Sequence, residues 1–497
     1  MNILKEIFRF RQFLTWLVFS CSLLVVCLHF HPLPSIESTL KNLSFGAGNR
    51  SSTLIVAFAT GNPWWHRYSP EGVIIQEDGL LQPRVEIPRQ SLQLSLRCAS
   101  LNPISDKDIE YNSTQGLLSK NKNLNSILAC QGKDILPYRD IGYYIFLGFI
   151  TFLNSLRSSN IILDFARILH IQEAIYLGSI FLGTISLFVC FRDKKKSSML
   201  LFLLATILVY SWIGKFQPEL FTLGIIDSTL APTIMILTVF LYVRFNQLVA
   251  LSANTKINLS LTLKVLLIGI ILSMLSMIRA EFFYINFISI CSFYFINLKY
   301  TKNLGLYSIL LSGLILFPVS YGLINLKLFG HFIPFRIGIG PNLIEPIGQF
   351  PNPWGIKYDD IWLIAQLSSH KLHYWSPLTD SYLSQQYWHF VLQNPVLFFS
   401  NFYQRLVIMG QVFYWPHLAT LLPLTFILLY VWSRDNEQAR ILFIIYIPAL
   451  VMLLWFAWFN LLVRVYAPAH YVLNFVVIGI IYLLLKKLLA IFQANTH

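Results

Sequence analysis

The sequence predicts an all-α polytopic membrane protein with about ten transmembrane helices. Hydrophobic residues make up 56% of the chain and charged residues only 12%, and the mean hydropathy is +0.60. A soluble protein carries about 25% charged residues. Aromatic residues reach 15%, which suits lipid-facing helices and aromatic belts at membrane surfaces. The shortage of charge therefore indicates a chain that crosses a bilayer many times.

The first predicted span is residues 13–30, "FLTWLVFSCSLLVVCLHF". No small-residue cleavage site follows it, so we expect a retained signal anchor. Lys5, Arg9 and Arg11 precede it and place the N-terminus in the cytoplasm by the positive-inside rule. The same rule explains the net charge of +14, because Lys and Arg lie at the ends of apolar segments. We therefore expect no nucleic-acid partner.

The basic cluster "RDKKK", residues 192–196, determines how the next segment is placed. Residues 141–153 are apolar, but a span needs about 20 residues. If 141–157 crossed the membrane, the following span would leave the basic cluster outside. The charge pattern therefore favours interfacial helices over 141–170 that lie along the outer surface.

The remaining apolar segments then alternate across the membrane with both termini cytoplasmic. The ten predicted spans are 13–30, 173–191, 198–213, 222–243, 264–280, 282–298, 304–324, 418–433, 441–460 and 470–486. The chain divides into an N-terminus with the first span (1–30), an external region (31–140), interfacial helices (141–170), spans (171–324), a second external region (325–417) and C-terminal spans (418–497).

The two external regions carry different signals. In 31–140, the segments "STLIVAF" and "SLQLSLRC" alternate in the way that strands do. Cys98 and Cys130 lie there too, either as a disulfide or as two free thiols. The region 325–417 is rich in Pro, Gly and Trp and ends in the amphipathic "NPVLFFSNFYQRLVIMG". Long external segments of this kind usually carry function.

Charged residues from separated segments gather at the outer face under this topology. They are Asp140, Glu219, Asp227, Arg279, Glu281, Arg464 and His470. Ionisable groups at membrane depth are costly and mark functional sites, although an Arg–Glu pair at a tight turn is as often a simple helix end. A carboxylate can take a proton from an acceptor hydroxyl, and arginines can hold a phosphate. The pattern predicts group transfer from a lipid-linked phosphate.

At these residues the sequence resembles the GT-C superfamily of membrane glycosyltransferases, and within it the bacterial relatives of protein O-mannosyltransferases and aminoarabinose transferases. The segment "RDIGYYIFLG", with Asp140 and Tyr143, is similar to the acidic residue and tyrosine that head an interfacial helix in that family. "ILDFARIL", with Arg167, is similar to the amphipathic stretch before the second span. "MIRAEFF" and "RVYAPAHYVL" resemble the outer arginine turn and the late Arg–Tyr–Pro segment. The resemblance covers most of residues 136–486.

This resemblance implies an inverting enzyme that moves a sugar from a polyprenyl-phosphate donor to a glycan, lipid or protein acceptor. The reaction would take place at the periplasmic face of a bacterial inner membrane. Asp140 would be the catalytic base, and Glu219 or Asp227 would assist it, with a divalent metal such as Mg or Mn as an open alternative. Arg279 and Arg464 would bind the donor phosphate. The substrate would be bound by Arg139, Tyr143, Glu281, Tyr466 and His470.

The sequence also departs from the family and leaves alternatives open. The family often has two adjacent acids where Ile141 follows Asp140. Asp106 and Asp108 form another acidic pair that could supply the base, and Asp359 and Asp360 form a third. A lipid-linked glycan polymerase or ligase would depend on Arg336 instead of Asp140. A transporter or flippase would place charges near the middle of the membrane.

Overall fold

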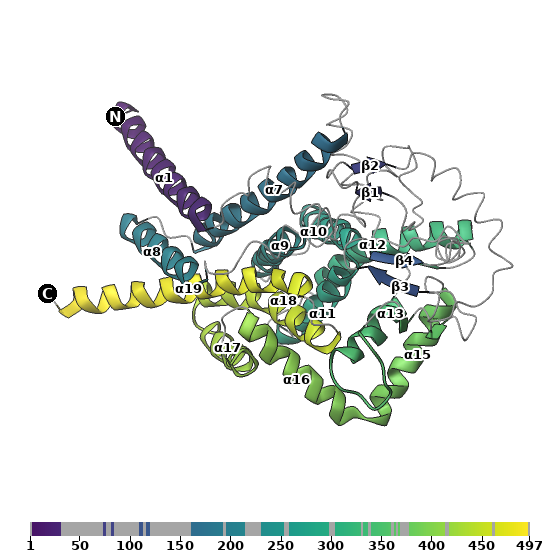
Figure 1. Ribbon diagram of the computed structural model, residues 1–497. Helices are drawn as coiled ribbons and strands as arrows, with labels where there is room; N and C mark the ends of the chain where they lie inside the picture. Colours follow the sequence, from purple (N-terminus) through teal and green to yellow (C-terminus); the bar gives the residue numbers. More distant parts are fainter. Residues whose placement is uncertain are drawn as a thin grey trace.

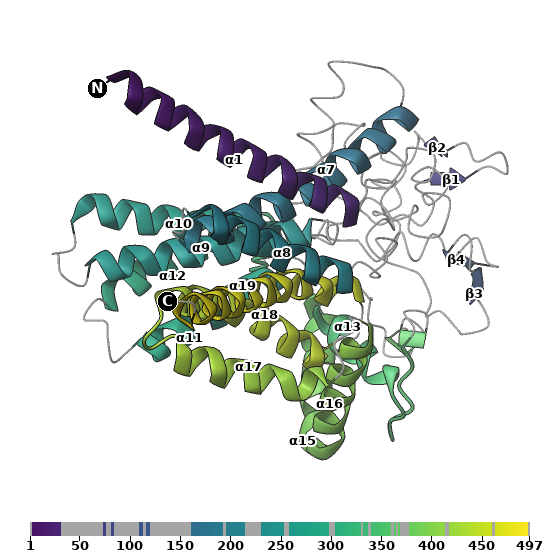
Figure 2. The same ribbon diagram turned by 90° about the vertical axis from the view of Figure 1, so that its left-hand side faces the viewer.

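The computed structural model describes residues 2–30, 73–75, 81–83, 109–112, 116–119, 161–191, 195–213, 230–252, 258–297, 304–329, 332–335, 339–358, 362–363, 366–367, 377–412, 417–459 and 463–495. The helices of the bundle are α1 (Asn2–Phe30), α7 (Ile161–Cys190), α8 (Lys196–Ile213), α9 (Ala231–Ser252), α10 (Leu259–Ile278), α11 (Glu281–Asn297), α12 (Leu304–Phe329), α17 (Leu418–Trp432), α18 (Glu437–Phe459) and α19 (Val463–Asn495). They pack around one buried apolar core (Figures 1 and 2).

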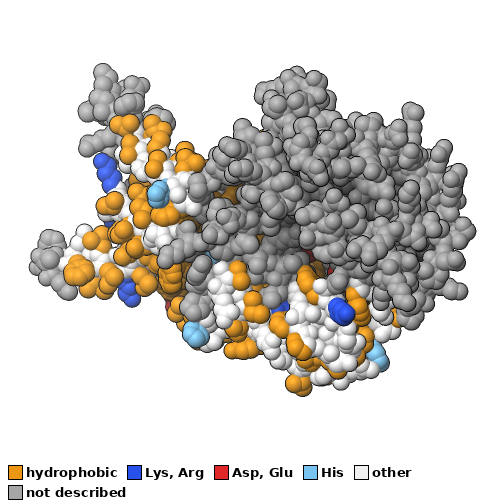
Figure 3. All heavy atoms as spheres, in the orientation of Figure 1, with side chains coloured by type: hydrophobic (Ala, Val, Ile, Leu, Met, Phe, Trp, Pro, Cys, Tyr) orange, Lys and Arg blue, Asp and Glu red, His pale blue; other side chains and the backbone are white. Residues whose placement is uncertain are grey.

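Five helices are long and apolar enough to cross a membrane, by length and composition: α9, α10, α12, α18 and most of α19. Shorter apolar helices within the described residues are 14–30, 174–190, 196–212, 281–296 and 418–432. Each of the ten overlaps one predicted span. Large apolar side chains are exposed along them, as Figure 3 shows for α1 and α19. The chain is therefore membrane-embedded, and the crossing of all ten helices stays a prediction.

Two predicted boundaries change. Residues 161–170 continue directly into α7 without a break at residue 171, because "ILDFARILHI" contains neither Gly nor Pro to interrupt a helix. The remaining part of the predicted interfacial region, 141–160, lies outside the described residues. The span predicted at 222–243 begins later, since α9 starts at Ala231 and ends at Ser252. Pro232 is tolerated there because the first turn needs no backbone N–H donor.

Short strands and helices make up the described parts of the two regions predicted to be external, and the helices of the second region are called the external helices below. Between 31 and 140, β1 (Val73–Ile75) pairs antiparallel with β2 (Leu81–Pro83), and β3 (Ile109–Asn112) with β4 (Gly116–Ser119). The two segments predicted as strands lie outside the described residues. The second region contains α13 (Ile339–Ile344), the 3-10 helix η5 (Glu345–Gln349), α15 (Pro377–Gln393) and α16 (Pro395–Val412). The amphipathic segment predicted before the eighth span is thus a helix, α16.

The external helices have their own apolar cluster, and the end of α18 packs against it. Its buried members are Ile344, Ile347, Ile356, Leu363, Leu367, Leu383, Tyr387 and Phe398. Trp458 and Phe459, the last residues of α18, contact this cluster. The external helices are therefore anchored at the end of the bundle where α10, α12 and α18 finish, which we call the α10–α11 end (Figure 2).

Helices α10 and α12 bring their backbones into close contact at Gly269 and Gly313. A Cβ atom at Gly269 would lie 2.5 Å from the backbone oxygen of Leu310 and 2.9 Å from Cα of Gly313. Small residues allow this backbone contact between membrane helices. Nearby, the Ser273 hydroxyl accepts a hydrogen bond of 3.1 Å from the backbone N–H of Phe317, beside Pro318 in α12. The two helices form a tightly packed pair, and Arg279 follows the last residue of α10.

Gly269→Ala is expected to lower the thermal unfolding temperature, because the new methyl meets backbone that cannot move aside. Overpacking of this kind costs about 1–3 kcal/mol. Gly178→Ala in α7 is the matched control, since nothing lies within 4 Å of its Cβ position. Alanine there should be neutral or slightly stabilising. Equal unfolding temperatures for both variants in nanodiscs would contradict the close contact between α10 and α12.

Candidate functional site at the α10–α11 end

The turn between α10 and α11 consists of two residues. Arg279 is extended, with φ −147° and ψ 120°, and ends α10, while Glu281 begins α11. The backbone N–H of Phe282 donates to the carbonyl of Arg279 (3.1 Å), and that of Phe283 to the carbonyl of Ala280 (3.0 Å). The turn therefore places Arg279 and Glu281 together at the tip of a helical hairpin.

Arg279 and Glu281 form an ion pair in which the arginine is nearly inaccessible. Arg279 Nε lies 3.5 Å from Glu281 Oε2, and the side chains are 4% and 19% exposed. A buried charge is costly unless it is paired and hydrogen-bonded. The more accessible Glu281 carboxylate offsets part of the cost of burying the arginine.

A chain of buried polar groups lies beneath the turn and joins three helices. The Tyr242 hydroxyl of α9 donates to Oδ1 of Asn286 in α11 (2.9 Å). Nδ2 of Asn286 donates to the Ser276 hydroxyl of α10 (3.2 Å), which donates to the carbonyl of Leu272 (2.8 Å). Buried networks of this kind hold helices in one arrangement. The sequence analysis did not predict this network. The feature that could have indicated it is Asn286, a single amide inside the apolar segment of α11.

Aromatic rings connect this turn with the end of α18. Tyr284 of α11 stacks on Trp455 of α18, with ring centroids 5.2 Å apart and planes 10° apart. The ring centroid of Phe335, which follows α12, lies 5.2 Å from that of Phe283 and 6.3 Å from that of Tyr284. The α10–α11 turn, the end of α12 and the end of α18 therefore meet in space.

The start of α19 follows directly after this meeting point. Arg464 and Tyr466 lie in its first turn, and their side chains are outside the described ones. His470 is buried, at 1% exposure, one turn further along. Asn474 follows on the same face, and neither atom of its buried amide has a hydrogen-bond partner among the described residues.

Several predicted site residues lie outside the described part of the chain, and the predictions for them stand untested. They are Arg139, Asp140, Tyr143, Glu219, Asp227, the alternatives Asp106, Asp108, Arg336, Asp359 and Asp360, and Cys98 and Cys130. Arg167 belongs to α7, with a side chain outside the described ones. Among the predicted residues, the structure brings Arg279 and Glu281 into direct contact.

Arg405 of α16 is a buried cation that the sequence analysis did not select. One terminal nitrogen, Nη1, donates to the carbonyls of Ala457 (3.2 Å) and Trp458 (2.7 Å) at the end of α18. The other, Nη2, donates to the carbonyl of Pro346 in η5 (2.7 Å). The guanidinium also lies 5.3 Å from the ring centre of Phe350. One side chain thus ties α16 and η5 to the last turn of α18.

Arg405 is only 4% exposed, so little water reaches its guanidinium. Desolvation by burial lowers its pKa to about 10, against the opposing effect of Tyr387 and Tyr358. The group therefore stays protonated at neutral pH. A cation is favoured at a helix C-terminus, where the free carbonyls carry partial negative charge. The signal in the sequence was an arginine on the same helical face as Phe398 and Met409.

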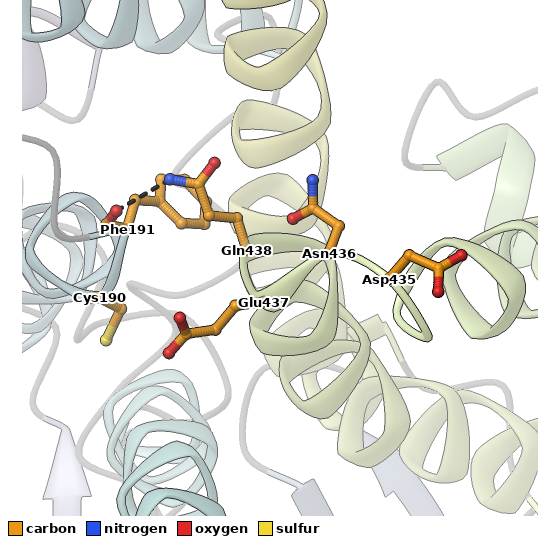
Figure 4. A pocket seen from close by; sticks show the side chains of 6 residues that line it. All are labelled: Cys190, Phe191, Asp435, Asn436, Glu437 and Gln438. Carbon is orange, nitrogen blue, oxygen red and sulfur yellow. Dashed lines mark hydrogen bonds between the residues drawn. The ribbon is translucent and has the colours of Figure 1, made fainter.

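A small cavity lies at the opposite end of the bundle, between the end of α7 and the start of α18. Its volume is about 310 Å³, and its lining residues are Cys190, Phe191, Asp435, Asn436, Glu437 and Gln438 (Figure 4). Gln438 donates to the carbonyl of Phe191 (2.9 Å), and Oδ1 of Asn436 accepts from Ala439 N–H (2.9 Å). Acidic residues around the first turn of a helix stabilise its dipole. We therefore interpret the polar lining of this cavity as the cap of α18, and we assign no substrate to it.

Within the described residues, no three His, Cys, Asp or Glu side chains are placed to hold a metal ion. The acids predicted to bind one, Glu219 and Asp227, are not among those residues. Comparisons with protein-family models, curated proteins and solved structures found no match.

Proposed function

We propose that this protein is a membrane glycosyltransferase that moves a sugar from a polyprenyl-phosphate donor to an acceptor at the outer face of a bacterial inner membrane. The observation that supports it best is the buried Arg279 beside Glu281, at the bundle end where the external helices are anchored. A guanidinium in such a place suits the phosphate of a lipid-linked donor, whose tail lies among apolar helices.

The proposed reaction is a single displacement. The acceptor hydroxyl attacks the anomeric carbon of the sugar, and Asp140 takes the hydroxyl proton. The bond between the anomeric carbon and the phosphate oxygen breaks, and the polyprenyl phosphate leaves. The configuration at the anomeric carbon is therefore inverted. Arg279 and Arg464 stabilise the charge on the leaving phosphate. Glu219 or Asp227 assists, and the residues Arg139, Tyr143, Glu281, Tyr466 and His470 surround the substrate.

Asp140→Asn tests this assignment against its alternatives. Loss of a general base typically costs a factor of about 10²–10⁴ in rate. Purified protein in vesicles should transfer label from a panel of polyprenyl-phosphate sugars to an acceptor extract, and the variant should transfer none above background. Equal expression and an unchanged unfolding temperature are the controls.

The same assay with Arg336→Ala separates the transferase from a polymerase or ligase of lipid-linked glycans. A transferase should keep most of its activity in this variant. Loss of activity in Arg336→Ala together with full activity in Asp140→Asn would favour the ligase. Movement of the labelled lipid between leaflets without transfer would favour a flippase.

A further inference from the structure

Helices α15 and α16 carry a row of exposed large apolar side chains where they meet. We call Trp388, Leu392, Val396, Phe399 and Tyr403 the 388–403 stripe. Each of these side chains is between 53% and 79% exposed. Their spacing of three or four residues places them along one face of each helix.

This stripe is a second apolar face, opposite the buried one, and Phe399 also lies edge-on to Trp458 of α18, with ring centroids 5.5 Å apart. The opposite face of α16 is buried and includes Phe398, Arg405 and Met409. Between residues 377 and 412 the only Asp, Glu, Lys or Arg residues are Asp380 and Arg405. Asp380 accepts from the backbone N–H of Gly340 (2.9 Å), and Arg405 is buried and donates to carbonyls of α18 and η5. A helical pair in water would normally carry charges on its outer face.

The orientation of α16 is that of a helix in a membrane surface. Figure 1 shows α17 nearly end-on while α16 lies in the plane of the view, and Figure 2 shows α16 at the end of α17. Helix α17 is one of the apolar helices, and its exposed face includes Leu424, Ile427 and Val431. A helix that crosses the end of a membrane helix, with an apolar outer face, lies in the interface plane.

We propose that the 388–403 stripe is a bilayer-contact surface that rests in the headgroup and upper acyl region of phospholipids at the α10–α11 end. Trp388 and Tyr403 have an apolar ring and a polar atom, which suits the headgroup level. Leu392, Val396 and Phe399 reach the acyl chains. Since Arg405 ties α16 to η5 and α18, the lipid contact also sets the depth of the external helices at the membrane.

Photo-crosslinking tests this surface in the full-length protein. The photoreactive residue p-benzoylphenylalanine replaces Phe399 or Tyr403, and in a control variant it replaces Lys357, an exposed polar position outside α15 and α16. The protein is reconstituted in vesicles of phosphatidylethanolamine and phosphatidylglycerol, irradiated and analysed by mass spectrometry. The substituted aromatic positions are exposed, so folding should persist, and the unfolding temperature checks this.

The expected result is at least about fivefold more phospholipid adduct at positions 399 and 403 than at 357. Equal lipid adducts at positions 357, 399 and 403 would overturn the proposal, and so would an absence of adducts at 399 and 403. Adducts between two copies of the chain at 399 and 403 would overturn it in favour of a self-association surface. None of these outcomes depends on the proposed glycosyl transfer.

Discussion

Arg405→Ala is expected to lower the unfolding temperature of the protein further than Gly269→Ala does. The alanine removes the donors to the carbonyls of Pro346, Ala457 and Trp458. Each buried carbonyl left without a donor costs about 1–3 kcal/mol, partly offset because the buried charge is removed as well. We expect a net loss of about 3 kcal/mol, measured as thermal unfolding in nanodiscs.

Arg434→Ala is the matched control for Arg405. Arg434 is exposed, lies 4.9 Å from the ring centre of Tyr430 and donates to its hydroxyl (3.2 Å). Its loss should cost less than about 1 kcal/mol. Arg405→Lys keeps the charge, but a single ammonium group cannot donate to all three carbonyls at once. Its unfolding temperature should therefore lie between those of the wild type and Arg405→Ala. An Arg405→Ala variant as stable as Arg434→Ala would show that the hydrogen bonds of Arg405 contribute nothing to folding.

Arg279→Ala is expected to have the largest effect on transfer among the described residues. If Arg279 holds the donor phosphate, its loss removes charge-assisted hydrogen bonds worth about 1.5–3 kcal/mol, or a factor of roughly 10–150 in kcat/KM for the donor. The measurement is donor-dependent transfer by vesicles that contain the purified variant. The acceptor KM should change little, because the acceptor makes no contact with this arginine in the proposed reaction.

Glu281→Gln separates binding from packing at the same turn. The glutamine is nearly the same size as Glu281 and keeps a hydrogen-bond acceptor for Arg279, but it removes the competing negative charge. It should therefore retain transfer better than Arg279→Ala. If Arg279→Ala lowers the unfolding temperature and leaves the donor KM unchanged, the role of the Arg279–Glu281 pair is only structural. The pair would then simply stabilise the helix ends at this turn.

Local patterns were enough to predict much of this architecture. Apolar runs predicted helices because a membrane leaves backbone groups no partner other than the chain itself. The tight sequence "SMIRAEFF" predicted a turn with Arg279 and Glu281 at its tip, and the structure confirms that turn. The alternation of runs also predicted one common face for the α10–α11 turn and the end of α18, and the stacking of Tyr284 in α11 on Trp455 in α18 agrees with it.

Other features depend on residues far apart in the chain. Arg405 looked like a charge in an amphipathic segment, since its partners lie more than 50 positions away. The Tyr242–Asn286–Ser276 network likewise forms only when three helices pack. The start of α9 was predicted too early because hydropathy alone gives no sharp boundary near Pro232.

The sequence by itself determined that the chain is membrane-embedded, which segments are helical, and that an arginine and a glutamate share a turn between two of them. Those properties follow from composition and from neighbours along the chain. Only the tertiary structure decided that Arg405 faces inward to cap α18 while Phe399 and Tyr403 face outward. Large apolar side chains occur on both the buried and the exposed side of α16, so hydropathy does not tell which side packs against protein. The carbonyls at the end of α18 make that choice, because they offer a buried cation the partners that lipid does not.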